Sequence, residues 1–125
     1  MTKNFKKSEF DCKCGCIMPT NVFVNIQKLA NQLQYVRDYL DLPINLTNAY
    51  RCPTHNKAVG GVKNSQHVLG KAADIKIKGL TPQEVAVILD RLTTDGDILQ
   101  GGIGIYNTFT HFDIRGKKAR WDNRT

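Results

Sequence analysis

Two segments that are far apart in the sequence place ionisable side chains inside patterns typical of a half-buried β-sheet. In the segment 71–77, apolar and polar residues alternate, so Asp74 lies on the face opposite to Ile75 and Ile77. The alternation recurs over 109–115, where the polar face carries His111, Asp113 and Arg115. A carboxylate is disfavoured in a strand. The chain must therefore form a sheet with one buried face and one face that gathers these polar groups.

The rest of the chain supplies helices to cover the buried face. Apolar residues recur at three- and four-residue steps over 26–40, and the stripe ends before Pro43. A second helix is expected to begin with Thr81 as N-cap and Pro82 at the first helical position, with Glu84 closing a capping box. Further strands are predicted over 44–50 and 101–106. The pattern predicts an α+β fold with a small antiparallel sheet and two main helices.

Length and composition favour a single domain over residues 1–125. The chain has 125 residues and 41% hydrophobic content, enough for one core. We expect the first 20 residues to pack on this domain as an ordered, cysteine-containing loop. The stretch 52–62 is rich in turn residues, so it predicts a loop beside the polar face, with His55 as a loop residue. From Gly116 we expect a polar tail in which Trp121 caps the core; the alternative for Trp121, and for Tyr106, is to line a pocket wall.

The charge balance favours an anionic partner without identifying it. There are 18 basic and 11 acidic residues, a formal charge of +7, which attracts nucleic acid, lipid head groups or an anionic cell wall alike. Basic residues near the start are not followed by an apolar run, so we expect neither a secretion signal nor a membrane span, and synthesis in the cytoplasm. Lysine and arginine do not alternate with aromatic residues in a stripe, which disfavours nucleic-acid binding.

Four cysteines form a second cluster of reactive groups, at Cys12, Cys14, Cys16 and Cys52. An even number is compatible with two disulfides, and close spacing is compatible with a bound metal. A reducing cytoplasm favours free or metal-bound thiols over disulfides. The spacing lacks the two-residue gap common in zinc sites, so a second, structural zinc ion is one alternative among these.

His67, Asp74 and His111 form a set of side chains suited to zinc. Imidazole nitrogen and carboxylate oxygen are ordinary zinc ligands, and neighbouring strands bring such side chains together without special backbone geometry. Three protein ligands leave the fourth position of the metal open. That arrangement is typical of a hydrolytic rather than a structural site.

The motifs around these residues resemble the zinc D-Ala-D-Ala carboxypeptidase family of cell-wall metallopeptidases, peptidase family M15. In particular, the chain resembles the short, single-domain phage and prophage members of endolysin type, and the resemblance covers nearly the whole chain. The residues that carry it are Ser8-Glu9-Phe10-Asp11-Cys12, Tyr50-Arg51, Asn56, Val59-Gly60-Gly61, Ser65-Gln66-His67, Gly70, Ala72, Asp74, Gly102-Ile103-Gly104-Ile105-Tyr106 and His111-Phe112-Asp113-Ile114-Arg115.

The resemblance implies roles for individual residues. It implies that His67, Asp74 and His111 bind zinc and that Arg51 binds a carboxylate of a peptide substrate. A guanidinium fits this role because it offers two parallel donors to a carboxylate. Ser65 and Gln66 are candidates for substrate binding or for supporting their loop.

The general base is the role that the family resemblance assigns least directly. Many relatives carry an acid three residues before the second zinc histidine, where this chain has Thr108. Asp113 is the nearest alternative, because two residues along a strand returns to the face of His111. We interpret Asp113 as the base or as a carboxylate that orients water or a ligand. Three alternatives remain for Asp113: a salt bridge to Arg115, a contact behind a zinc histidine, or direct metal binding in place of His111.

These observations lead to three functional hypotheses. The first is a monomeric zinc peptidase of the peptidoglycan stem peptide, a D,D-carboxypeptidase or an endopeptidase, acting as a phage or prophage endolysin on the wall after release from the cytoplasm. The second is a non-catalytic zinc-binding interaction module, as in the hedgehog signalling domains that share this architecture. The third is a nucleic-acid-binding protein with a cysteine zinc knuckle. The complete zinc motif and Arg51 favour the first.

Overall fold

The computed structural model of the protein describes residues 1–62 and 64–125. In chain order the elements are η1 (Lys7–Phe10), α1 (Thr20–Leu40), β1 (Ile44–Asn48), α2 (Pro53–Ala58), β2 (Ala72–Ile77), α3 (Pro82–Thr94), β3 (Gly102–Ile105), β4 (Thr110–Asp113) and β5 (Ala119–Asp122). Within the described residues, none of the helices has the length and apolar character needed to cross a membrane.

The five strands form one sheet in the order β1-β2-β4-β3-β5. Neighbouring strands are antiparallel except β3 and β5, which run parallel. The strand pair β2 and β4 lies near the centre of this sheet and brings residues 72–75 opposite residues 110–113. The two segments whose alternation predicted the sheet therefore form adjacent strands near its centre.

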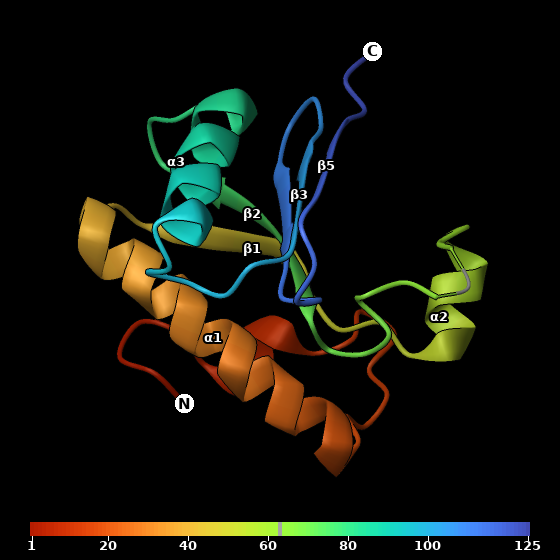
Figure 1. Cartoon of the computed structure of the whole chain (residues 1–125). Helices are drawn as coiled ribbons and strands as arrows, with labels where there is room; N and C mark the ends of the chain where they lie inside the picture. The colour runs from red at the N-terminus through yellow and green to blue at the C-terminus, as the bar shows by residue number, and fades with distance from the viewer. Residues whose placement is uncertain (63) are drawn as a thin grey trace.

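The two faces of the sheet differ in chemistry. Ala73, Ile75 and Phe112 point into the hydrophobic core, which α1 and α3 complete with Leu29 and Leu89. Figure 1 shows α1 and α3 on one side of the strands and α2 projecting on the other. The opposite face of β2 and β4 carries the polar residues. The N-terminal segment also contributes to the core, through Phe5, Phe10, Cys12 and Met18.

Local sequence signals explain where α3 begins and where α1 ends. The hydroxyl of Thr81 accepts a hydrogen bond from the Glu84 backbone N–H, and the Glu84 carboxylate accepts one from the Thr81 N–H. This capping box begins α3 at Pro82, as predicted. Helix α1 ends at Leu40, where Asp41 adopts a left-handed conformation with φ of 52°. Pro43 then prevents a further turn.

The structure corrects three expectations. The stretch 52–62 contains α2, so His55 is helical rather than a loop residue. The tail from Gly116 contains β5, and Trp121 lies in this strand beside Gly104 instead of capping the core. Because β5 pairs parallel to β3, the sheet is mixed rather than wholly antiparallel. The last two depend on pairing between distant segments, which local patterns do not encode, whereas α2 is built from residues that are also typical of turns.

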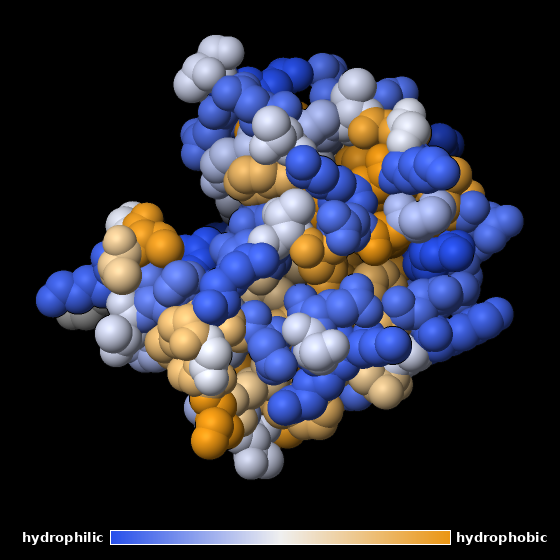
Figure 2. Space-filling model, turned by 180° about the vertical axis from the view of Figure 1, so that it is seen from behind, coloured by the Kyte–Doolittle hydropathy of each residue, from blue (hydrophilic) through white to orange (hydrophobic). Residues whose placement is uncertain are grey.

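The surface agrees with the high content of charged and polar residues. Figure 2 shows the molecule from behind the view of Figure 1, and hydrophilic side chains cover most of this face. Hydrophobic side chains gather there in separate patches, and the outline is indented above the part that projects at the left of this view.

Candidate metal centre

The strand register aligns one row of residues across the polar face of the sheet. Asp74 of β2 is opposite His111 of β4, and His111 is opposite Gly104 of β3. Gly104 is in turn opposite Trp121 of β5. Opposite residues on adjacent strands project from the same face. The row therefore places a carboxylate, an imidazole and an indole next to one another.

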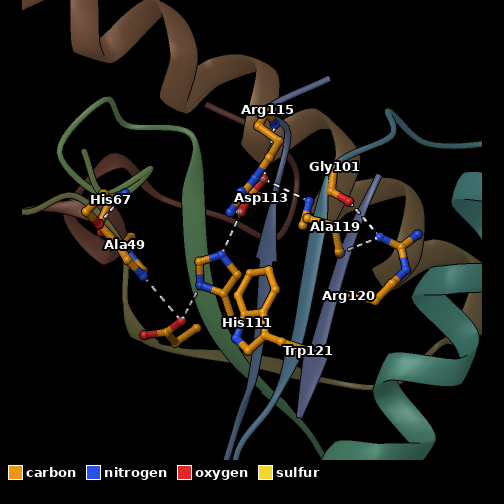
Figure 3. Close-up of polar contacts among 12 residues, drawn as sticks. Ala49, His67, Gly101, His111, Asp113, Arg115, Ala119, Arg120 and Trp121 are labelled. Carbon is orange, nitrogen blue, oxygen red and sulfur yellow. Dashed lines mark hydrogen bonds and ion pairs between the residues drawn. The ribbon is translucent and has the colours of Figure 1, made fainter. Parts of the chain in front are cut away.

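Glycine at position 104 allows the indole to lie against the histidine. A Cβ atom at Gly104 would overlap the Trp121 indole. Without that atom, the ring centroids of Trp121 and His111 are 5.1 Å apart, and Figure 3 shows the two rings in contact beside the strands. The glycine in this strand thus has a packing role that fixes one wall of the site.

His67 reaches the same carboxylate from the loop between α2 and β2. Its Nε2 atom lies 3.3 Å from Oδ1 of Asp74, and Nδ1 of His111 lies 3.2 Å from the same oxygen. One ligand atom from each of the three buried residues lies within 4.8 Å of the others. Strand pairing and one loop therefore bring together the three side chains that the sequence singled out as ligands.

A further contact orients each histidine ring. His67 Nδ1 lies 2.7 Å from the carbonyl oxygen of Ala49, and His111 Nε2 lies 2.7 Å from Oδ2 of Asp113 (Figure 3). An oxygen acceptor in this place holds a proton on that nitrogen, so the other nitrogen of each ring is the one that faces Asp74 and is available to a metal. Histidines that bind metals are oriented in this way. The donor set therefore fits a metal ion.

Asp113 lies behind His111 and is fully buried. Its two oxygens accept hydrogen bonds from Nε and Nη2 of Arg115, at 2.9 and 2.7 Å, and from the Gly102 N–H at 2.8 Å. Burial alone would raise the pKa of this carboxyl, but the hydrogen bonds from His111, Arg115 and Gly102 outweigh it and lower the pKa. Asp113 is thus an ionised carboxylate whose oxygens are already engaged.

The centre is electrostatically suited to a cation. Burial would raise the pKa of the Asp74 carboxyl, yet hydrogen bonds with His111 and His67 lower it below its usual range. Burial would lower the pKa of His111, but Asp113 and Asp74 together raise it. Two ionised carboxylates therefore flank one imidazole, and this negative environment favours a positive charge at the position shared by the three ligands.

Arg51 shares a cleft of about 430 Å³ with the three ligands. Its Nη1 donates a 2.9 Å hydrogen bond to the side chain of Asn56, and buried Asn56 donates in turn to the Val62 carbonyl at 2.8 Å. A Cβ atom on Gly61 would overlap Asn56 and Arg51, so only glycine permits this packing. Within residues 1–62 and 64–125, the buried Nε of Arg51 has no hydrogen-bond partner. Asn56 therefore holds the guanidinium in place at the cleft.

The other predicted site residues occupy different positions around the cleft. Ser65 and Gln66 both line it. The Ser65 hydroxyl accepts a 3.1 Å hydrogen bond from the His67 N–H, whereas the buried Gln66 Oε1 has no partner among the residues described. Thr108 is exposed in the turn between β3 and β4 and lines an adjoining groove. Asp74 is the only carboxylate among the described residues that line the cleft.

Two contributors to the site were not foreseen in their roles, and a third contact joins two residues of the expected pocket wall. The Ala49 carbonyl holds His67, Asn56 holds Arg51, and the Trp121 indole N–H donates to the Tyr106 hydroxyl at 3.0 Å on the cleft wall. Asn56 belongs to the motif that carries the family resemblance, and Gly104, in the strand beside Trp121, is the sequence signal for the close packing of the indole. A backbone carbonyl leaves none.

The four cysteines also come together, where the N-terminal segment meets the start of α2. Their sulfur atoms lie within 4.8 Å of one another, so they too fit a metal site.

Two histidines and a carboxylate that face a cleft define a single-metal site of the kind found in metallohydrolases. A family model described as Peptidase M15 matches residues 3–113, and the chain belongs to the peptidase M15 family. Membership in this family makes the protein a metallopeptidase. No curated protein matches the chain significantly.

Proposed function

We propose that the protein is a zinc-dependent peptidase that hydrolyses an amide bond in the peptidoglycan stem peptide. The observation that carries this proposal is that His67, Asp74 and His111 share one cleft with Arg51. A metal centre beside a fixed guanidinium suits a substrate with a cleavable amide and a nearby free carboxylate. Stem peptides offer both, and the charge of +7 favours an anionic wall.

Zinc in such a site supplies Lewis acidity, which activates water and polarises the amide carbonyl. The chain's own residues provide the rest. Arg51 binds the substrate carboxylate with its guanidinium, and its contact with Asn56 fixes where that carboxylate lies. Trp121 and Tyr106 form a cleft wall that restricts the substrate to one side of His111.

For Asp113 we propose the orienting role rather than that of the base. The carboxylate is fully buried behind His111, and its contacts with His111, Arg115 and Gly102 use both oxygens. A base must come within hydrogen-bond reach of the proton that it accepts. Asp113 instead fixes the tautomer and the angle of the His111 ring, so that Nδ1 stays directed at the metal position.

The test is to incubate zinc-loaded protein with purified peptidoglycan and identify the released fragments by mass spectrometry. Loss of a terminal D-alanine would establish a D,D-carboxypeptidase, and a new end inside the stem peptide would establish an endopeptidase. His67→Ala should release nothing. His55→Ala is the matched control because it removes the remaining histidine, which lies in α2 outside the ligand set, and it should release the same fragments as the unaltered protein.

A second candidate function is a non-catalytic zinc-binding module of the same fold. The observation in its favour is that, within the described part of the chain, Asp74 is the only carboxylate lining the cleft. With Asp74 on the metal, the cleft has no separate acid to accept a proton. Absence of zinc-dependent fragments from several wall types, together with tight zinc binding, would favour this second function.

The biological setting that we propose is cell lysis by a phage or prophage. The resemblance to single-domain endolysins and the positive charge support it. Purified protein added to permeabilised host cells should lower their turbidity. Turbidity that stays unchanged while isolated peptidoglycan is cleaved would point to a role other than lysis.

A further inference from the structure

The four cysteines join two segments that are far apart in the sequence. Cys12, Cys14 and Cys16 lie in the loop between η1 and α1, whereas Cys52 is the N-cap residue of α2. The Sγ atoms of Cys12 and Cys14 are 3.2 Å apart, and those of Cys14 and Cys52 are 3.4 Å apart. Sulfur atoms from both segments thus surround one point.

These separations fit a metal ion better than disulfides. A disulfide requires sulfurs at about 2.0 Å, and all four cysteines are free. In a tetrahedral zinc site with Zn–S bonds of about 2.3 Å, the sulfurs lie about 3.8 Å apart. The four Sγ atoms, all within 4.8 Å of one another, need only small shifts to reach that geometry.

Backbone donors favour the thiolate form of two of the four sulfurs, those of Cys12 and Cys52. The Cys52 N–H donates to Sγ of Cys12 at 3.3 Å, and the His55 N–H donates to Sγ of Cys52 at 3.4 Å. The second bond lies at the first turn of α2, where backbone N–H groups lack partners within the helix. Thiolates bind zinc, and such N–H contacts hold them in place.

We propose that Cys12, Cys14, Cys16 and Cys52 bind one zinc ion as a structural site that is separate from the site of His67, Asp74 and His111. Binding exchanges four thiol protons for one Zn²⁺ and involves no oxidation or reduction. Four protein ligands fill the coordination sphere, so this site has no open position for water or substrate.

The position of the site gives it a consequence for the cleft. Arg51 directly precedes Cys52, and Asn56, which holds Arg51, lies in the helix that Cys52 begins. The neighbouring Tyr50 N–H donates to the Phe10 carbonyl at 3.1 Å, so the N-terminal segment already lies along this strand end. A zinc ion bound by the four cysteines would hold the two segments together and fix the position of the backbone at Arg51.

The first experiment measures metal content and does not depend on catalysis. Protein purified under reducing conditions should contain two zinc ions per chain. His67→Ala should retain one, and the double variant Cys14→Ser, Cys16→Ser should also retain one. With cobalt in place of zinc, intense sulfur-to-cobalt charge-transfer absorption should appear in the unaltered protein and in His67→Ala, and should be absent from the double cysteine variant.

A second measurement avoids the risk that the cysteine variant does not fold. A mercurial reagent that blocks thiols is titrated into the unaltered protein, and released zinc is read with a chromogenic chelator. One zinc ion should be released as four thiols react. The proposal is overturned if the protein holds one zinc ion that His67→Ala removes, or if intact mass shows two disulfides. It is also overturned if cobalt shows no charge-transfer absorption. None of these results bears on whether the enzyme cleaves peptidoglycan.

Discussion

The histidine site and the cysteine cluster are built on opposite structural principles. Asp74 and His111 stand on paired central strands, and each histidine has a second contact, to Ala49 or Asp113, that fixes its ring. The cysteines stand on loops and at a helix start, and two backbone N–H contacts are their main support. The first site is therefore pre-organised by the fold. The second needs the metal to complete its geometry.

This difference separates the roles that we propose for the two metal ions. Loss of metal from the histidine site leaves the sheet and its hydrogen bonds in place, so the expected effect is on activity. Loss of metal from the cysteines releases the contact between the N-terminal segment and α2, so the expected effect is on local order. The predictions below test this contrast, from the largest expected effect to the smallest.

The largest effect is expected from removal of the shared carboxylate. Asp74→Ala deletes the one oxygen that both histidines approach, so metal binding at this site and peptidase activity should fall to the level of a control without enzyme. Metal analysis measures the bound metal, and release of peptidoglycan fragments measures the activity. The metal ion proposed at the four cysteines should remain. Asp122→Ala is the matched control, since Asp122 is exposed at the end of β5. Residual activity near normal in Asp74→Ala would mean that catalysis occurs elsewhere.

The next effect concerns substrate binding rather than metal binding. Arg51→Ala should leave the zinc content unchanged and lower kcat/KM by about 10- to 100-fold, because a charge-assisted hydrogen bond contributes about 1.5–3 kcal/mol. Most of the loss should appear as a higher KM, since binding to an unreactive part of the substrate is lost. Arg51→Lys should restore only part of the lost kcat/KM, because a lysine ammonium lacks the two parallel donors of a guanidinium. A fall in kcat alone would argue against carboxylate binding.

Asp113→Asn tests the contact behind the metal site. Loss of such an orienting carboxylate weakens metal affinity by about 10- to 100-fold, and we expect that range in a zinc competition titration with a chromogenic chelator. Asparagine keeps the shape and one oxygen acceptor, which limits damage around Arg115. Unchanged zinc affinity combined with lost turnover would instead identify Asp113 as the base.

Sequence patterns predicted the parts of the molecule that depend on local signals. Alternation around Asp74 and His111 predicted a sheet with a polar face, and Thr81 and Pro82 predicted the start of α3; the structure confirms both. The short helix α2 was missed because its six residues are rich in turn formers and it begins at a cysteine. The orientation of the His111 ring, which decides what Asp113 contacts, depends on tertiary packing and has no signature in the sequence.

The smallest effect is expected in the loop that carries His67, the one of the three proposed metal ligands that lies outside the sheet. Ser65→Ala removes the hydroxyl that accepts the His67 N–H, so the free energy of unfolding should fall by about 1 kcal/mol. Because Ala49 still holds the His67 ring, zinc affinity should fall less than in Asp113→Asn. Denaturant unfolding measures the first quantity and zinc titration the second, with Ser8→Ala, at an exposed serine, as control. A higher KM with unchanged stability would show that the Ser65 hydroxyl binds substrate. A loss of zinc affinity as large as that of Asp113→Asn would mean that the loop, and not only the strands, pre-organises the metal site.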